Sequence, residues 1–216
     1  MKLAGWAGVL GFMSAGIGSA GIGAFDGGAL WQFPGTQSSP AEIASFVAEH
    51  RTAALVAMVL NALGVSLWLV FGAGVWLKLR EGGESVLSGC FALGLTGFVT
   101  LIFAGFTPFF LLAYRGAAPD EARLLYDLTF GLLAMSGVPT ALALCSYCAL
   151  VWRTGRFPRW TAVLAAIGSA THLLLLASFV VKDGFFSLEG QVITVIPATL
   201  FFWILGTSVA MLRADR

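Results

Sequence analysis

Six long stretches of the sequence contain no Asp, Glu, Lys or Arg, and this feature limits what the chain can fold into. The stretches cover residues 3–25, 53–77, 86–114, 128–152, 161–181 and 190–212. A helix needs about 20 mostly apolar residues to cross a bilayer, and each stretch reaches that length. Because the backbone finds no water in lipid, each stretch is predicted to be a helix. We expect an all-α bundle of six transmembrane helices, forming a single integral membrane domain over residues 1–216.

The composition supports this prediction and excludes several classes of protein. Of the 216 residues, 58% are hydrophobic and 11% are charged, against about 25% charged residues in soluble domains. The net charge of +1 gives no basic excess, so no nucleic-acid partner is expected. The sequence has no P-loop, zincin, GxSxG or dinucleotide-binding motif in a suitable context. The motifs therefore do not identify a cofactor, which stays unknown from the sequence.

The basic residues predict the orientation in the membrane. With the N-terminus in the cytoplasm, most Lys and Arg residues fall on the inside, which favours N-in and C-in. The inner set is Lys2, Lys78, Arg80, Arg153, Arg156, Arg159, Arg213 and Arg216, and the outer set is Arg51, Arg115, Arg123 and Lys182. Similar strings at 138–153 and 195–213 suggest three related helical hairpins. The expected location is the plasma membrane, as a multi-pass protein.

The outer loop 26–52, the longest connection, contains a signal for a short helix. Ser39-Pro40-Ala41-Glu42 has the form of a capping box with proline at the first helical position. Apolar and amphipathic residues then recur at helical spacing, at Ile43, Phe46, Val47 and His50. We expect a short amphipathic helix on the outer membrane surface, leading into the span 53–77.

A stripe of small residues runs along the first span. Its members recur every four residues, at Ala7, Gly11, Ala15, Ser19 and Gly23. Small residues let helix backbones approach closely in lipid. Packing in the centre of the bundle is favoured, and the alternative is a surface for a protein partner or a second copy of the chain.

His172 lies about midway along the span 161–181. An ionisable group within a span is costly to bury and marks a functional site by default. A neutral imidazole can relay a proton or bond to a ligand. Other polar residues lie at broadly middle depth and are candidates to converge with it: Asn61, Ser136, Thr140, Thr171 and Thr194. The alternative is a hydrogen bond to a neighbouring helix. A single histidine does not predict a metal site.

Aromatic residues crowd the outer ends of the spans, among them Phe106, Phe109 and Phe110. Apolar walls with a few polar groups suit a hydrophobic small molecule. An acid among aromatic rings can also protonate an alkene and stabilise the cation. The alternative is an ordinary interfacial belt with solvated loop charges.

Near the inner end, Cys90, Cys145 and Cys148 are interpreted as buried thiols rather than ligands of a soft metal.

Three strings resemble those of a broad group of small, uncharacterised actinobacterial polytopic membrane proteins that carry a domain of unknown function. The strings are FVAEHRTAALV (46–56), RTGRFPRW (153–160) and IPATLFFWILGTSVAMLR (196–213). The resemblance implies six helices. It implies no activity and no site residue.

Three functions stay open, all with membrane lipid as a partner. The leading hypothesis is a protein that binds a hydrophobic or lipid-like small molecule in an outward-opening pocket. Its ligand-binding candidates are Asn61, Phe106, Phe109, Phe110, Thr140 and His172. The second hypothesis is a membrane-embedded enzyme that acts on an isoprenoid or lipid by acid–base chemistry. Its catalytic candidates are Asp26, Glu49, Asp127 and His172. The third is an accessory or structural subunit of a membrane complex.

Overall fold

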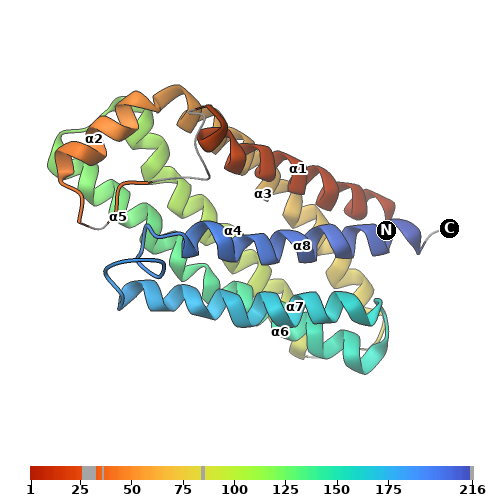
Figure 1. Ribbon diagram of the computed structural model, residues 1–216. Coiled ribbons are helices and arrows are strands. Elements are labelled where there is room, and N and C mark those ends of the chain that lie inside the picture. Colours follow the sequence, from red (N-terminus) through yellow and green to blue (C-terminus); the bar gives the residue numbers. More distant parts are fainter. Residues whose placement is uncertain (26–32, 36, 84–85, 215–216) are drawn as a thin grey trace.

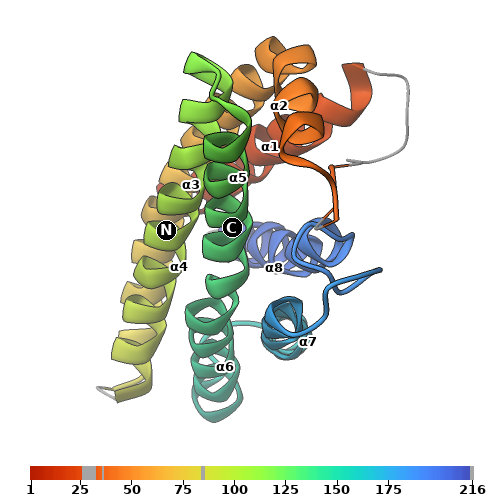
Figure 2. The ribbon, with the colours of Figure 1, turned by 90° about the vertical axis from the view of Figure 1, so that its left-hand side faces the viewer.

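The computed structural model describes residues 1–25, 33–35, 37–83 and 86–214, and the side chains at 20–25 and 194 lie outside that description. Throughout this part the regular structure is helical, and it contains no strand. The elements are α1 (Lys2–Phe25), α2 (Pro40–Glu49), α3 (Arg51–Arg80), α4 (Val86–Arg115), α5 (Pro119–Met135), α6 (Gly137–Thr154), α7 (Arg159–Leu173), the 3-10 segment η1 (Leu174–Phe179) and α8 (Val192–Arg213). Figures 1 and 2 show the bundle from two sides, and the all-α prediction is confirmed.

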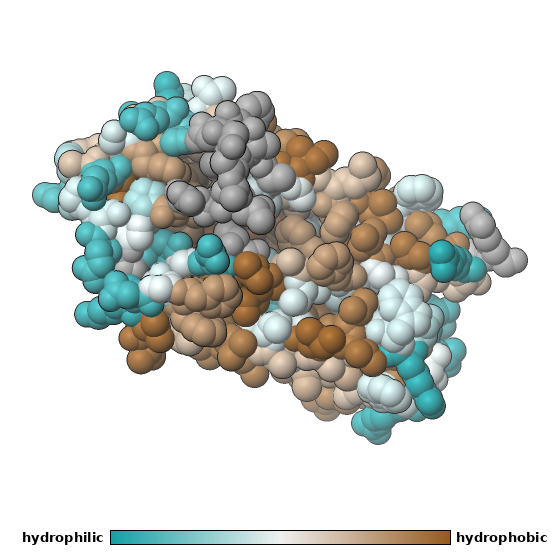
Figure 3. Space-filling view, viewed as in Figure 1, coloured by the Kyte–Doolittle hydropathy of each residue, from teal (hydrophilic) through white to brown (hydrophobic). Residues whose placement is uncertain are grey.

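Five helical segments are long and apolar enough to cross a membrane, so the protein is a polytopic membrane protein. They are Arg51–Arg80, Val86–Arg115, Pro119–Thr154, Arg159–Phe179 and Val195–Arg213, found by searching the described residues. Each overlaps one predicted stretch. The remaining stretch, 3–25, is helical as α1, but the side chains of its last six residues lie outside the description. In Figure 3, hydrophobic residues gather along the middle of the molecule and hydrophilic residues gather at its two ends.

Both chain termini lie at the same end of the bundle (Figure 1). The connections α3–α4 and α6–α7 meet there, because the guanidinium of Arg156 lies 3.6 Å from the Glu81 carboxylate. The ammonium of Lys78 lies 3.7 Å from the same carboxylate oxygen. We call this the basic end and the opposite end, which carries α2, the α2 end. The predicted topology requires this grouping of the inner basic residues.

The short helix α2 begins as the sequence predicts. The amide of Glu42 donates to the Ser39 hydroxyl oxygen at 3.2 Å, and the Glu42 carboxylate accepts from the Ser39 amide at 2.6 Å. Ile43 and Val47 are buried against side chains of the bundle, including Tyr126 of α5. A helix is present where the capping box predicts it, and its apolar face packs mainly on α5. Its position on the outer membrane surface stays a prediction.

Two predicted spans are not single regular α-helices. The span 128–152 is formed by α5 and α6, which meet at Ser136. Pro139 has no amide hydrogen for the carbonyl of Met135, so the α-helical pattern is interrupted just before it. The span 161–181 is α-helical to Leu173 and continues as the tighter 3-10 segment η1. Both irregular points lie next to the site described below.

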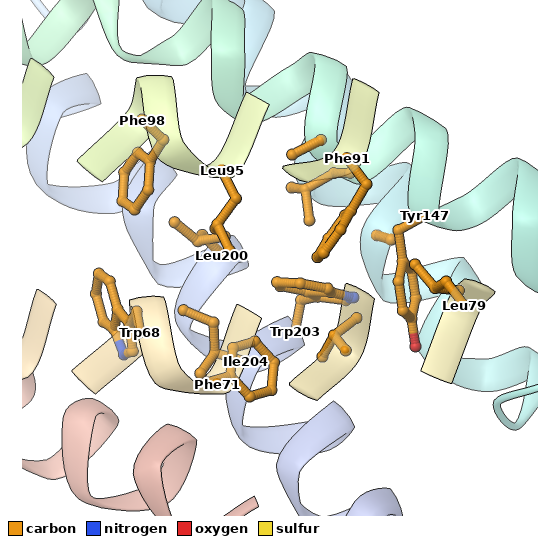
Figure 4. Close-up of a cluster of buried hydrophobic side chains, with 14 of the residues drawn as sticks. Trp68, Phe71, Leu79, Phe91, Leu95, Phe98, Tyr147, Leu200, Trp203 and Ile204 are labelled. Carbon is orange, nitrogen blue, oxygen red and sulfur yellow. The ribbon is translucent and has the colours of Figure 1, made fainter. Parts of the chain in front are cut away.

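The centre of the bundle is filled by aromatic and branched side chains from α3, α4, α6 and α8 (Figure 4). The ring of Trp203 contacts Phe71 and Tyr147 edge to face, with centroids 5.5 and 5.0 Å apart. Such pairs contribute about 0.5–1.5 kcal/mol beyond the area they bury. They fix α8 against α3 and α6.

The helix α1 packs on α3 through the stripe of small residues. Ala7 and Ala15 are buried. A Cβ on Gly64 of α3 would lie 2.7 Å from the carbonyl oxygen of Gly11 and 2.7 Å from the amide nitrogen of Ala15. The two backbones therefore touch, as small residues allow in lipid. Packing within the bundle is confirmed for the described part of the stripe. The binding of a protein partner or a second copy of the chain through the small-residue face of α1 stays a prediction.

Candidate functional site

A cavity of about 330 Å³ lies between the helices. Its wall comes from α1, α3, α4, α5, α7, η1 and α8, together with Ser136 and Phe33. Along α3 the lining extends from Met58 to Trp68, which is about 15 Å at the rise of an α-helix. The cavity therefore reaches from the aromatic core towards the α2 end. We call it the inter-helix cavity.

Most of the wall is apolar and aromatic. Phe33 packs edge to face on Phe109 and Phe130, with ring centroids 6.2 and 5.0 Å apart. At the other end the rings of Trp68 and Phe98 are stacked, 6.0 Å apart. Among the described residues of the lining there is no Asp, Glu, Lys or Arg. A charged group would enter without a counter-ion at a high cost, so the wall suits an uncharged and largely apolar molecule.

Asn61 forms a polar part of the wall and ties α1 to α3. It is 5% exposed. Its Nδ2 donates to the carbonyl of Ala57 at 2.9 Å, within α3. Its Oδ1 accepts from the hydroxyl of Ser19 on α1 at 3.1 Å. The amide is thus held in one orientation by two partners.

His172 lies where α7 passes into η1, and its side chain is 2% exposed. Its Nδ1 lies 2.8 Å from the carbonyl oxygen of Gly168. A carbonyl only accepts, so Nδ1 carries the hydrogen, and in the neutral imidazole Nε2 then keeps a lone pair. The sequence-based alternative is a hydrogen bond from His172 to a neighbouring helix. Nδ1 instead bonds to a residue of its own helix, α7. A Cβ on Gly137 would overlap the carbonyl oxygen of His172, so the break between α5 and α6 lies beside this histidine.

The structure brings four of the six ligand-binding candidates to the inter-helix cavity. Asn61, Phe106, Phe109 and His172 line it. Thr140 and Phe110 do not: the hydroxyl of Thr140 donates to the carbonyl of Ser136 at 2.7 Å, and Phe110 packs against the apolar cluster beneath α2. That these residues bind a ligand stays a prediction.

The acidic catalytic candidates lie elsewhere. Asp127 is partly exposed and accepts from Nε of Arg123 at 2.9 and 3.0 Å. Glu49 is exposed at the end of α2. Asp26 lies outside the described residues. Within the described part of the chain, His172 is thus the catalytic candidate that lines the cavity, and no carboxylate lies there with it.

The remaining polar candidates are used in packing or lie apart. The hydroxyls of Thr171 and Thr199 bond at 2.9 Å and join α7 to α8. The side chain of Thr194 is outside the description. Cys145 is exposed, so the interpretation of it as a buried thiol is wrong, whereas Cys90 and Cys148 are half-buried. A search of the described residues finds no group of three side chains that could hold a metal ion.

Some wall residues were not singled out from the sequence as site residues. On one face of α3, three of them lie at intervals of three and four residues around the predicted candidate Asn61. They are Met58, Val65 and Trp68. Following helical periodicity outward from Asn61 would have named the others. Pro197 of α8 also lines the cavity, and a proline inside a helix is a signal for a carbonyl that has lost its donor.

Comparison with protein-family models, curated proteins and solved structures found no match. The resemblance to small actinobacterial membrane proteins therefore stays a prediction. The function has to be argued from the inter-helix cavity itself.

Proposed function

We propose that this protein binds a hydrophobic, lipid-like small molecule in the inter-helix cavity. The observation that carries the proposal is the lining, which combines aromatic walls with a few uncharged polar groups and no charged side chain among its described residues. An engineered apolar cavity of about 150 Å³ holds a benzene ring. The volume of about 330 Å³ therefore has room for a molecule, or part of one, of roughly twelve non-hydrogen atoms.

The same proposal includes six spans with both termini in the cytoplasm. The helix α1 is 24 residues long and supplies Gly16 and Ser19 to the cavity wall, which supports its role as the sixth span. The excess of Lys and Arg at the basic end supports a cytoplasmic location for that end. The α2 end then faces outwards, and the cavity occupies the outer half of the membrane. A ligand would reach it from that side.

The proposal is tested by mass spectrometry of organic extracts from gently purified protein. Three samples are compared: the natural sequence, Ala198→Phe and Ala166→Phe. Ala198 lines the cavity, so a phenylalanine there fills it, whereas Ala166 is exposed on α7 and serves as a matched control. Size-exclusion chromatography checks that all three fold.

We expect one uncharged compound to accompany the natural protein and Ala166→Phe in near-equal molar amounts. Ala198→Phe should lose that compound. If all three samples release the same mixture of bulk membrane lipid, the proposal is wrong.

A further inference from the structure

The hydroxyl hydrogens on the wall of the inter-helix cavity are already used within the protein. Thr129 and Ser136 each donate to a backbone carbonyl of α5, at 2.9 and 2.6 Å. Ser19 donates to the side chain of Asn61. A hydroxyl oxygen that has donated its hydrogen still carries lone pairs. These groups therefore present acceptors to a ligand, and no hydroxyl donor.

The N–H groups of two wall residues face α1 rather than the cavity. Nε1 of Trp68 is fully covered, and a Cβ on Gly11 would lie 2.8 Å from it. In Figure 4 this nitrogen is on the side of the indole turned towards α1. Nδ2 of Asn61 donates within α3, and a Cβ on Gly18 would lie 2.6 Å from it. The indole hydrogen is therefore not placed to donate to a ligand, and the amide has already used one of its two hydrogens.

His172 adds an acceptor of a different kind. Since Nδ1 carries the ring hydrogen, Nε2 has a lone pair, and it has no hydrogen-bond partner among the described residues. His172 lines the cavity, so this unpaired acceptor belongs to the cavity wall. The backbone carbonyl of Ile193 is a further acceptor in the wall without its usual donor. It loses its α-helical donor because residue 197 is proline, and both residues line the cavity.

We infer that the ligand carries one uncharged hydrogen-bond donor, a hydroxyl, on an apolar chain, and that this hydroxyl donates to Nε2 of His172. This inference rests on the proposed function and names its ligand class, the neutral long-chain or isoprenoid alcohols. Ethers, ketones and esters offer only acceptors, and the polar groups of the wall are mostly acceptors too. A protonated amine donates but brings a charge without a counter-ion. A carboxylate or phosphate brings charge and further acceptors.

The experiment uses the full chain in nanodiscs with ¹⁵N-labelled histidine. The sequence has two histidines, so His50 at the end of α2 is an internal reference and His172→Phe assigns the signals. The probes are 1-decanol, methyl nonyl ether and undecane, which have the same number of non-hydrogen atoms. The first has a donor, the second has an acceptor only, and the third has neither. Binding of each probe at equal membrane concentration is measured in the natural protein and in Ala198→Phe.

We expect 1-decanol to bind about fivefold more tightly than the ether or the alkane, the ratio that one hydrogen bond provides. It should move the Nε2 signal of His172 and leave that of His50 unchanged, and His172→Phe should abolish the preference. If the three probes bind equally well and the His172 signal stays in place, the inference is wrong while the proposed function stands. If no probe distinguishes the natural protein from Ala198→Phe, the proposed function itself fails.

Discussion

Two cavities of nearly equal volume differ in the charge of their lining. The inter-helix cavity, of about 330 Å³, has aromatic walls and no charged side chain among the described residues that line it. The second cavity, of about 350 Å³, lies at the basic end and is lined by Lys78, Arg156 and Arg213 together with Trp160. The volume of a cavity therefore does not determine which kind of ligand it binds. A basic lining near the bundle end suits anions or water, whereas an uncharged lining between helices excludes both kinds of ion.

The two cavities share one helix, which makes the comparison testable. The first turns of α8 contribute Ile193, Pro197 and Ala198 to the inter-helix cavity. Its last turns contribute Ala210 and Met211 to the cavity at the basic end. The same substitution at Ala198 and at Ala210 thus places one new group in two different surroundings, with helix and residue type held constant.

The largest expected effect comes from placing a carboxylate in each wall. Ala198→Glu puts a charge among apolar groups and should cost about 3 kcal/mol of unfolding free energy, the scale for a charge near mid-membrane. Ala210 is also buried, but Ala210→Glu puts the same group in a wall that carries three cations, so it should cost clearly less than Ala198→Glu. Denaturation in mixed micelles measures both values. Equal destabilisation would show that the two linings do not differ electrostatically.

A smaller effect is expected from the polar tie in the wall of the inter-helix cavity. Asn61→Leu keeps the side-chain size but leaves the Ser19 hydroxyl without its acceptor on α3. Interhelical hydrogen bonds in membranes average about 0.6 kcal/mol, so a loss of about that size is expected. Ser66→Ala is the matched control, since Ser66 is exposed and bonds only within α3. The same denaturation assay should show no change for it. If Ser66→Ala lowers the unfolding free energy as much as Asn61→Leu does, the hydrogen bond between Ser19 and Asn61 does not stabilise the bundle more than a bond within one helix.

The sequence predicts the spans well because charge is absent over lengths set by the bilayer. The capping box at Ser39 is equally local, and it was predicted correctly. The rotation of each helix about its axis cannot be predicted in the same way. In lipid both the outward face and the core face are apolar, so hydropathy does not separate Phe109, which lines the cavity, from Phe110, which does not. The same ambiguity placed Thr140 in the site.

The state of His172 also depends on information that the pattern of residues lacks. Its depth follows from counting along the span. The direction of its Nδ1 depends on which rotamer reaches the carbonyl of Gly168, and its backbone carbonyl lies against Gly137, next to the break at Ser136. Proline at position 139 marks a place where such a break can form. Prolines are tolerated within membrane helices, however, so the residue alone does not say whether the helix breaks.

The smallest expected effect concerns the basic end. The carboxylate of Glu81 forms ion pairs with the ammonium of Lys78, at 3.7 Å, and the guanidinium of Arg156, at 3.6 Å. The Glu81 side chain is 52% exposed. Exposed ion pairs contribute roughly 0.2–1 kcal/mol and weaken with salt. Glu81→Gln should therefore lower the unfolding free energy by about 0.5 kcal/mol at low ionic strength and by almost nothing near 1 M salt. Glu49→Gln, at an exposed carboxylate of the α2 end, should change little in either condition. A loss at Glu81 that persists in high salt would point to packing rather than charge, and the contrast between the two cavities would then rest on the inter-helix cavity alone.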